Sequence, residues 1–211
     1  MEFKRYSIEK GDLVKFIEKG PRACICPKCK KITPIEVNAE YYIGSDINGD
    51  DIFPKIDNIE CTHCGEKFSM SFYDMLDPNI AECVKILNDA GFETNASCEG
   101  HKSNDEDEGS IAYISFKDNS LTYQDQEYII NHIPDSWMFY ITCVYTKNKH
   151  ESRYTLYNDI DDARAYKDKE YKKEILNIFK DFCKELYLYK KGEEYDTWSL
   201  YRCINKDISE W

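Results

Sequence analysis

Two short cysteine pairs constrain the fold of this sequence more than any other feature. The first pair is Cys26 and Cys29, the second is Cys61 and Cys64, and 31 residues lie between the pairs. Four thiolates from two such turns can surround one Zn²⁺ tetrahedrally, at about 2.3 Å per Zn–S bond. The spacing predicts a structural zinc ion, because four thiolates leave no open position for water or substrate.

The two turns, Cys26-Pro-x-Cys29 and Cys61-x-x-Cys64-Gly, resemble those of zinc ribbons over about a quarter of the chain. The resemblance implies a small β module at residues 23–73, held together by the metal because its own core is small. A redox pair and two disulfides are the alternatives to a metal, and Cys24 or His63 could replace one of the four ligands. Zinc ribbons serve nucleic-acid binding, enzymes and protein interaction, so the module alone does not decide the function.

The rest of the composition points to a cytoplasmic chain with a packed core. Hydrophobic residues make up 42% of the 211 residues, and no apolar run reaches the length of a membrane span. The first residues lack the apolar segment of a signal peptide, so the ten cysteines are not expected to form a secreted disulfide scaffold. Cys83, Cys143 and Cys183 lie in apolar periodic segments and are expected in the core.

Charge is distributed unevenly along the chain. The net charge is −12, yet residues 1–35 carry nine Lys and Arg against four Asp and Glu. An acidic body repels phosphate backbones, so nonspecific nucleic-acid binding is not expected. Only the basic N-terminal end, with Lys28, Lys30 and Lys31, could contact phosphate.

Two further segments flank the proposed zinc module. Residues 1–22 are interpreted as a helical arm, because Asp12 can cap a short helix and Gly20-Pro21 can end it. Residues 77–211 are interpreted as the larger domain. Its periodicity predicts helices at 77–90, 123–132 and 162–189, and strands at 92–96, 111–116, 137–145 and 153–157.

This order of elements predicts the fold class. Two helix-strand-strand units followed by a helix favour one antiparallel sheet with helices on one face, an α+β sandwich. A circularly permuted ferredoxin-like topology would fit that order. We therefore expect an α+β protein in which a small β zinc ribbon accompanies the sandwich.

Reactive side chains gather in the segment Ser97-Cys98-Glu99-Gly100-His101. It follows a predicted strand and opens a polar loop expected at 97–110. A turn at Gly100 could bring thiol and imidazole together as a nucleophile, as half of a second metal site with His132 or His150, or as part of an acid–base pair. The structural alternative is a buried thiol, a backbone-bonded imidazole and a left-handed glycine.

The same segment, with Gly91-Phe-x-Thr94 before it, resembles small phage and Firmicute proteins that carry a Ser-Cys-x-Gly-His signature. It is more distantly similar to the wybutosine-synthesising tRNA methyltransferase family, in which Arg follows Ser-Cys-x-Gly and where this chain has His101. The resemblance covers about 30 residues. It implies a substrate-facing role for Ser97, Cys98 and His101.

Three functions remain open on the sequence, and the chain is not assigned as an enzyme or a non-enzyme. The first is a noncatalytic zinc protein that binds another protein, such as a phage or mobile-element regulator or inhibitor of a host protein. The second is an enzyme or binder of a small molecule, nucleotide or RNA, acting through Ser97, Cys98, Glu99 and His101. The third is DNA binding through the ribbon and the basic N-terminal arm.

Overall fold

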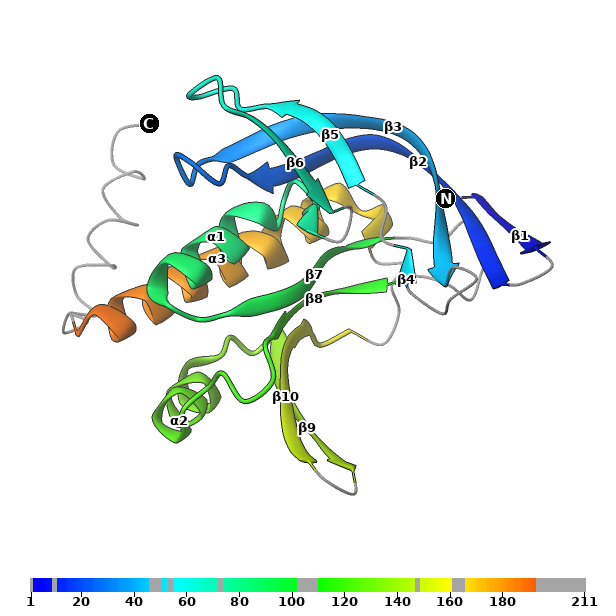
Figure 1. Ribbon diagram of the computed structural model, residues 1–211. Coiled ribbons are helices and arrows are strands. Elements are labelled where there is room, and N and C mark those ends of the chain that lie inside the picture. The colour runs from blue at the N-terminus through cyan, green and yellow to red at the C-terminus, as the bar shows by residue number, and fades with distance from the viewer. Residues whose placement is uncertain are drawn as a thin grey trace. The chain divides into compact units, whose positions relative to one another are not determined.

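The chain folds as a mixture of helices and antiparallel sheets in the computed structural model (Figure 1). This confirms the α+β class. The structure describes residues 2–8, 11–45, 51–52, 55–71, 74–101, 110–146, 149–160 and 166–192. Within these ranges there are three helices, and none is long and apolar enough to cross a membrane.

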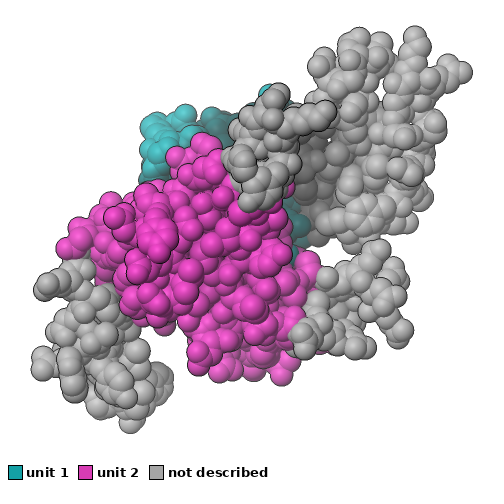
Figure 2. All heavy atoms as spheres, turned by 90° about the horizontal axis from the view of Figure 1, so that it is seen from below, with its two compact units in different colours: residues 1–85, 97–99 teal, residues 86–96, 100–211 magenta. Residues whose placement is uncertain are grey.

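The described chain divides into two compact units, coloured separately in Figure 2. The first unit comprises residues 1–85 and 97–99, and the second comprises residues 86–96 and 100–211. The boundaries of the three expected domains stay a prediction.

The first unit contains a sheet with the strand order β1-β2-β3-β4. Strands β2 (Gly11–Ile25) and β3 (Ile32–Ser45) pair along most of their length and form the long ribbon in Figure 1. Strand β1 (Glu2–Ile8) pairs with the N-terminal half of β2, and β4 (Asp51–Ile52) pairs with the C-terminal end of β3.

The helical arm expected at residues 1–22 is wrong, because this segment forms β1 and most of β2. The apolar residues at 13, 14, 16 and 17 fit a short helix and a strand equally well. Pairing decides between the two, since Val14 and Phe16 align with Ile43 and Tyr41 of β3. The strand also continues through Gly20, whose φ of 130° is a conformation that glycine adopts readily and other residues rarely do.

A second, two-stranded sheet lies within residues 23–73, where the sequence predicts a zinc module. Strands β5 (Lys55–Glu60) and β6 (Lys67–Ser71) are antiparallel, with a register shift between Ile56 and Ile59. The second cysteine pair lies in the turn between these strands, and the first pair lies in the turn between β2 and β3. Each cysteine pair is therefore held at the tip of a hairpin.

The larger sheet has the strand order β7-β8-β10-β9. Its strands are β7 (Thr94–His101), β8 (Ser110–Phe116), β9 (Trp137–Thr146) and β10 (Lys149–Asn158). Together with helices α1 (Ala81–Ala90), α2 (Tyr123–His132) and α3 (Lys169–Lys191), they follow the order of elements expected from the sequence. The permuted ferredoxin-like topology stays a prediction.

Helix α3 packs its apolar stripe on one face of this sheet. Phe179, Phe182 and Leu186 are almost fully buried. The Trp137 ring of β9 stacks on Phe179 with ring centroids 3.8 Å apart, and its indole N–H donates to the carbonyl of Ile175 at 3.3 Å. This contact satisfies the one polar atom of a buried tryptophan.

Local signals set the helix ends. Thr122 and Asp125 form a reciprocal capping box at the start of α2, where the sequence predicts the helix to begin. Asp168 caps α3, which begins at Lys169 rather than at 162, and Gly192 ends it with a φ of 67°. Asp77 accepts the first α1 amides with its backbone carbonyl, so its side chain serves another purpose.

Candidate metal centre

The two cysteine turns share one backbone geometry. In the first knuckle, residues 26–31, the amide of Lys30 donates to the carbonyl of Cys26 at 3.0 Å, and the amide of Cys26 donates to the carbonyl of Lys31 at 3.0 Å. In the second knuckle, residues 61–66, Gly65 bonds Cys61 at 2.9 Å, and Cys61 bonds Glu66 at 2.8 Å in the same pattern. Each knuckle presents its two sulfurs from a closed turn.

The four sulfurs are spaced as zinc ligands. All four lie within 4.8 Å of one another, with 3.8 Å between Cys26 and Cys64 and 3.6 Å between Cys29 and Cys61. A tetrahedron with Zn–S bonds of about 2.3 Å has sulfur–sulfur edges of about 3.8 Å. A disulfide needs about 2.05 Å. Both short distances join one knuckle to the other, so the geometry fits a shared metal and not a bond within either turn.

The surroundings of Cys61 favour its thiolate form. It is buried, and the hydroxyl of buried Thr33 donates to its sulfur at 3.3 Å. The hydrogen bond from Thr33 lowers the pKa of Cys61 to about 5, aided by the amides of His63 and Cys64 and the Cys29 thiol, against the effect of desolvation. A thiolate is the form that binds metal, so the site holds one ligand ready at neutral pH.

The pKa of Cys64 is shifted in the opposite direction, upward. The Glu66 amide lowers its pKa, but desolvation and hydrogen bonds with the other cysteines raise it to about 12. A second thiolate beside the first is disfavoured without a cation between them. Zinc would supply that cation and release the remaining protons on binding.

The two alternative ligands lie outside the cluster. Cys24 is fully buried and donates to the carbonyl of Thr33 at 3.5 Å. Desolvation, with the nearby Cys26 and Cys61 sulfurs, raises its pKa to about 11, so it stays a neutral thiol. The His63 ring is exposed and bonds the carbonyl of Ile32 at 3.0 Å.

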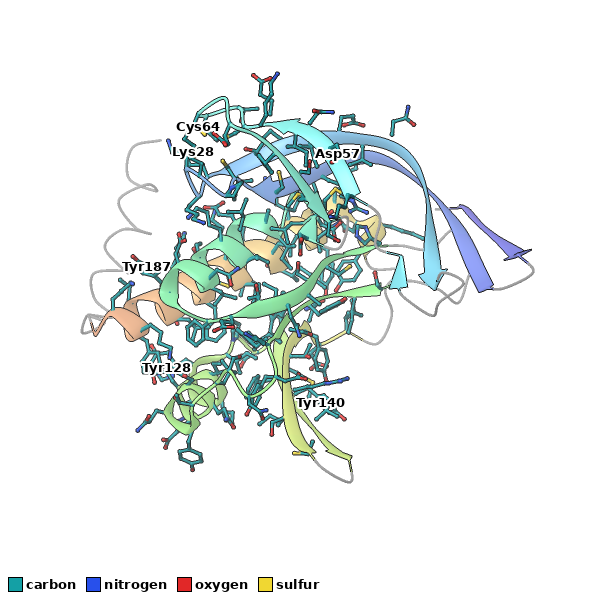
Figure 3. The ribbon with its side chains drawn as sticks, viewed as in Figure 1. Lys28, Asp57, Cys64, Tyr128, Tyr140 and Tyr187 are labelled. Atoms are coloured by element: carbon teal, nitrogen blue, oxygen red, sulfur yellow. The ribbon has the colours of Figure 1, made fainter. Side chains whose placement is uncertain are left out.

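One side of the centre reaches the surface. Cys64 is exposed, and Figure 3 labels it beside Lys28 at the tip of the module. Lys28 bonds Glu66 at 2.8 Å and so links the two knuckles, while Lys30 and Lys31 are exposed nearby. The centre can therefore hold a metal with four thiolates, and its rim carries lysines.

The segment predicted as a reactive loop belongs instead to a strand. Ser97, Cys98, Glu99 and His101 all lie on β7, which extends to His101 where the sequence predicted a polar loop. Cys98 and Glu99 are buried and His101 is exposed. The polar residues misled the interpretation because their partners, which satisfy them in a strand, lie far away in the sequence.

Within the first unit, the carboxylates beside Cys98 hold the chain together. Asp77 forms an ion pair with Arg22 and accepts the amide of Glu99 at 3.1 Å. The Glu99 carboxylate accepts the amide of Asn79 at 2.9 Å. An Asp77 oxygen and the Cys98 sulfur lie within 4.8 Å. The sequence singled out Cys98 and Glu99 but missed the part played by Asp77, where it predicted only the start of a helix.

In the second unit, Gly100 is required by packing. Its φ is 82°, and a Cβ placed there would lie 2.8 Å from ring atoms of Tyr166. The Tyr166 hydroxyl donates to Asn158 at 2.9 Å and accepts the amide of Ala112 at 2.9 Å. Gly100 therefore fits the structural interpretation of the motif, which includes a left-handed glycine.

Sequence reasoning named all four cysteines of the cluster and missed Thr33. Its only signal is a polar, β-branched residue in a strand that follows a Cys-x-x-Cys turn. Comparison with protein families, with curated proteins and with solved structures finds no match. The resemblance of the Ser97–His101 segment to other proteins stays a prediction.

Proposed function

We propose that this chain is a zinc-binding, noncatalytic protein that acts by binding another protein. The observation that carries the proposal is the spacing of four thiols at zinc-ligand distance, with sulfurs 3.6 and 3.8 Å apart across the two knuckles. A four-thiolate zinc has no vacant position for water or substrate. The metal would thus shape a module and would not perform chemistry.

The rim of the centre offers the contact surface of this proposal. Lys30 and Lys31 are exposed beside the cysteine cluster, and Lys28 is paired with Glu66. Outside residues 1–35 the chain carries 36 acidic against 19 basic residues, so the first knuckle, with its three lysines, contrasts with the rest of it. Such a rim suits an acidic protein surface.

Nucleic acid fits this rim less well. The slope of log affinity against log salt is about −0.9 per neutralised phosphate for duplex DNA, so two or three lysines give weak binding. The acidic remainder of the chain adds repulsion. We therefore keep DNA binding as an outcome of the test and not as a second proposal.

An enzyme built on Cys98 and Glu99 is also less favoured. The backbone amide of Glu99 donates to the Asp77 carboxylate, and the Glu99 carboxylate accepts the amide of Asn79, so both groups of Glu99 form structural hydrogen bonds. A catalytic carboxylate must reach the reacting atoms of the substrate, whereas the carboxylates of Asp77 and Glu99 bond backbone amides. A regulator of a host protein, of the kind that phages and mobile elements encode, needs no such site.

The test combines capture with reconstitution. A tagged wild-type chain is used to capture proteins from a lysate, and each enriched protein is purified and titrated against the zinc-loaded chain. We expect one to one binding that is lost in Cys61→Ser and weakened at least tenfold in Lys30→Glu/Lys31→Glu. The control is Lys167→Glu/Lys169→Glu, an equal charge change at exposed residues in and beside the N-terminal turn of α3.

Two results would overturn the proposal. One is binding that survives loss of the zinc site unchanged, since the module would then play no part in it. The other is a band shift with duplex DNA that is saturable at low salt and lost in Lys30→Glu/Lys31→Glu, which would make the surface a nucleic-acid site.

A further inference from the structure

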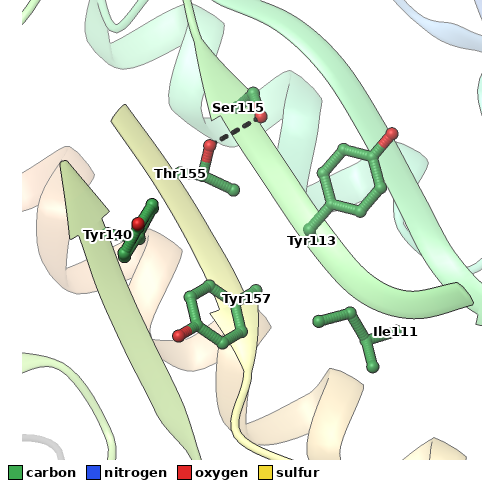
Figure 4. Close-up of a pocket in the computed structure, with 6 residues that line it drawn as sticks. All are labelled: Ile111, Tyr113, Ser115, Tyr140, Thr155 and Tyr157. Carbon is green, nitrogen blue, oxygen red and sulfur yellow. Dashed lines mark hydrogen bonds between the residues drawn. The ribbon is translucent and has the colours of Figure 1, made fainter. Parts of the chain in front are cut away.

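The face of the larger sheet opposite α3 carries a shallow pocket of about 450 Å³ that is largely open to solvent, called the cavity below. It lies entirely within the second unit, and Figure 4 shows its side chains in front of the strands with the helix behind them. Its walls come from three strands: β8, β9 and β10. The lining residues are Ile111, Tyr113, Ser115, Tyr140, Thr155 and Tyr157.

Strand alternation builds this face. On β8 the side chains of Ala112, Ile114 and Phe116 are buried on the helix side, so the residues between them point the other way. On β10, Leu156 is fully buried, and its neighbours Thr155 and Tyr157 line the cavity. The sheet thus has one face that forms the core and one that presents aromatic rings.

Two tyrosines form a corner of the cavity. The rings of Tyr140 and Tyr157 lie 6.3 Å apart between centroids and are inclined by 72°. The Tyr157 hydroxyl donates to the Met138 sulfur at 3.5 Å, which restrains its ring. Tyr140 is 56% exposed, a large fraction for an aromatic residue in a strand. A flat molecule could stack on one ring and meet the other with its edge.

A pair of hydroxyls supplies the polar contact. Ser115 and Thr155 face each other on neighbouring strands, and their oxygens lie 2.9 Å apart (Figure 4). Two hydroxyls together have two donor hydrogens and four acceptor lone pairs. Their mutual bond uses one of each, so the pair can still donate and accept. That capacity matches the edge of a ring in which N–H and C=O groups are adjacent.

Charge selects against an ionic ligand. None of the six lining residues is charged, and the chain as a whole carries −12. Arg153, the next outward residue on β10, is 3.6 Å from the carboxylate of Asp118. A phosphate would find no positively charged partner among the lining side chains, whereas an uncharged ring needs none.

We propose that this cavity binds an uncharged planar heterocycle of the nucleobase or nucleoside class. Its volume lies in the range of about 300–1,000 Å³ found for small-molecule sites. The tyrosine corner would hold the ring, and the hydroxyl pair would read its edge. This proposal does not depend on the metal centre.

The test is calorimetric or ligand-observed NMR titration of the full zinc-loaded chain with uridine, adenosine, uridine monophosphate and methyl riboside. We expect a saturable site for at least one nucleoside, weaker binding of the monophosphate and no binding of the riboside. Tyr140→Ala should weaken binding about tenfold or more, as loss of a stacking ring does. Thr155→Val should reduce the preference among bases. Tyr140→Phe should retain binding.

Tyr123→Ala is the matched control, because Tyr123 is 78% exposed on α2 and lies outside the cavity. It should leave affinity unchanged. The proposal is overturned if no nucleoside saturates a site, or if the monophosphate or the riboside binds as well as the nucleoside. It also fails if Tyr140→Ala and Tyr123→Ala behave alike. Circular dichroism of each variant shows that the fold is retained, and Tyr140→Phe with Thr155→Val decide the matter if Tyr140→Ala does not fold.

Discussion

Lys30 and Gly65 occupy equivalent positions in the two knuckles, each directly after the second cysteine. Both residues have left-handed backbones, with φ of 59° at Lys30 and 69° at Gly65, and both amides bond the first cysteine of their turn. A side chain in this region costs about 1–2 kcal/mol relative to right-handed conformations, and glycine avoids the cost. The first knuckle therefore carries a strain that the second does not.

Lys30→Gly should raise the free energy of unfolding of the zinc-loaded protein by about 0.5–1 kcal/mol, because it relieves this strain. Chemical denaturation measures the change. Lys31→Gly is the matched control, since Lys31 is exposed and has no left-handed backbone. It should lower the stability slightly through the entropy of the unfolded chain. Equal effects of the two substitutions would show that Lys30 is not strained.

Thr33→Val should weaken zinc binding about tenfold to a hundredfold, the range measured for residues that bond metal ligands. The substitution removes the hydroxyl that donates to Cys61 and that lowers its pKa. Competition with a chromophoric chelator measures the affinity. Thr62→Val, at an exposed threonine of the second knuckle, should leave it unchanged. An unaltered affinity in Thr33→Val would remove Thr33 from the metal centre.

Asp125→Asn should destabilise the second unit by about 2–4 kcal/mol, because Asp125 is 1% exposed and bonds both Lys190 and Thr122. Denaturation at neutral pH measures the loss. Lys184→Met breaks the exposed pair with Asp181 and should cost less than about 1 kcal/mol. An equally small loss in Asp125→Asn would contradict the buried pair.

The same carboxylate predicts a pH dependence. Burial raises the pKa of Asp125, but the hydrogen bonds from Lys190 and Thr122 outweigh it, so the folded pKa lies below the ordinary value. A lowered folded pKa adds stability that is complete above the unfolded pKa of about 3.9 and is lost as the pH falls through the folded value. The difference in stability between wild type and Asp125→Asn should therefore shrink below about pH 4. A difference that stays constant from pH 7 to pH 3 would contradict this assignment.

Gly100→Ala should destabilise the protein more than Gly91→Ala does. Both glycines have positive φ, at 82° and 97°, so both substitutions incur backbone strain. Only at Gly100 would the new Cβ meet the Tyr166 ring, at 2.8 Å. We expect an extra loss of about 1–3 kcal/mol, as for overpacking, measured by thermal or chemical denaturation. Equal losses at the two sites would mean that the ring moves aside freely.

The sequence was most informative where local chemistry decides the structure. The four clustered cysteines follow from their spacing, and the helix predicted at 123–132 coincides with α2. The order of helices and strands after residue 77 also follows from periodicity. In these cases neighbouring residues hold all the information that is needed.

Prediction from the sequence failed where pairing between distant segments of the chain determines the structure. The run around Val14 became a strand because Ile43 and its neighbours lie alongside, 29 positions away in the numbering. Strand β7 extends to His101, although its residues read as a polar loop. The tyrosine cavity could not be predicted either, since Tyr140 and Tyr157 meet only once β9 and β10 pair in register.

Native mass spectrometry of the metal content tests the central claim most directly. The account predicts one zinc per chain in wild type and in Cys98→Ala, and none in Cys61→Ser. No zinc in wild type purified with zinc present would contradict the metal centre. Two zincs in wild type that fall to one in Cys98→Ala would contradict a single structural site and make the Ser97–His101 segment a second metal centre.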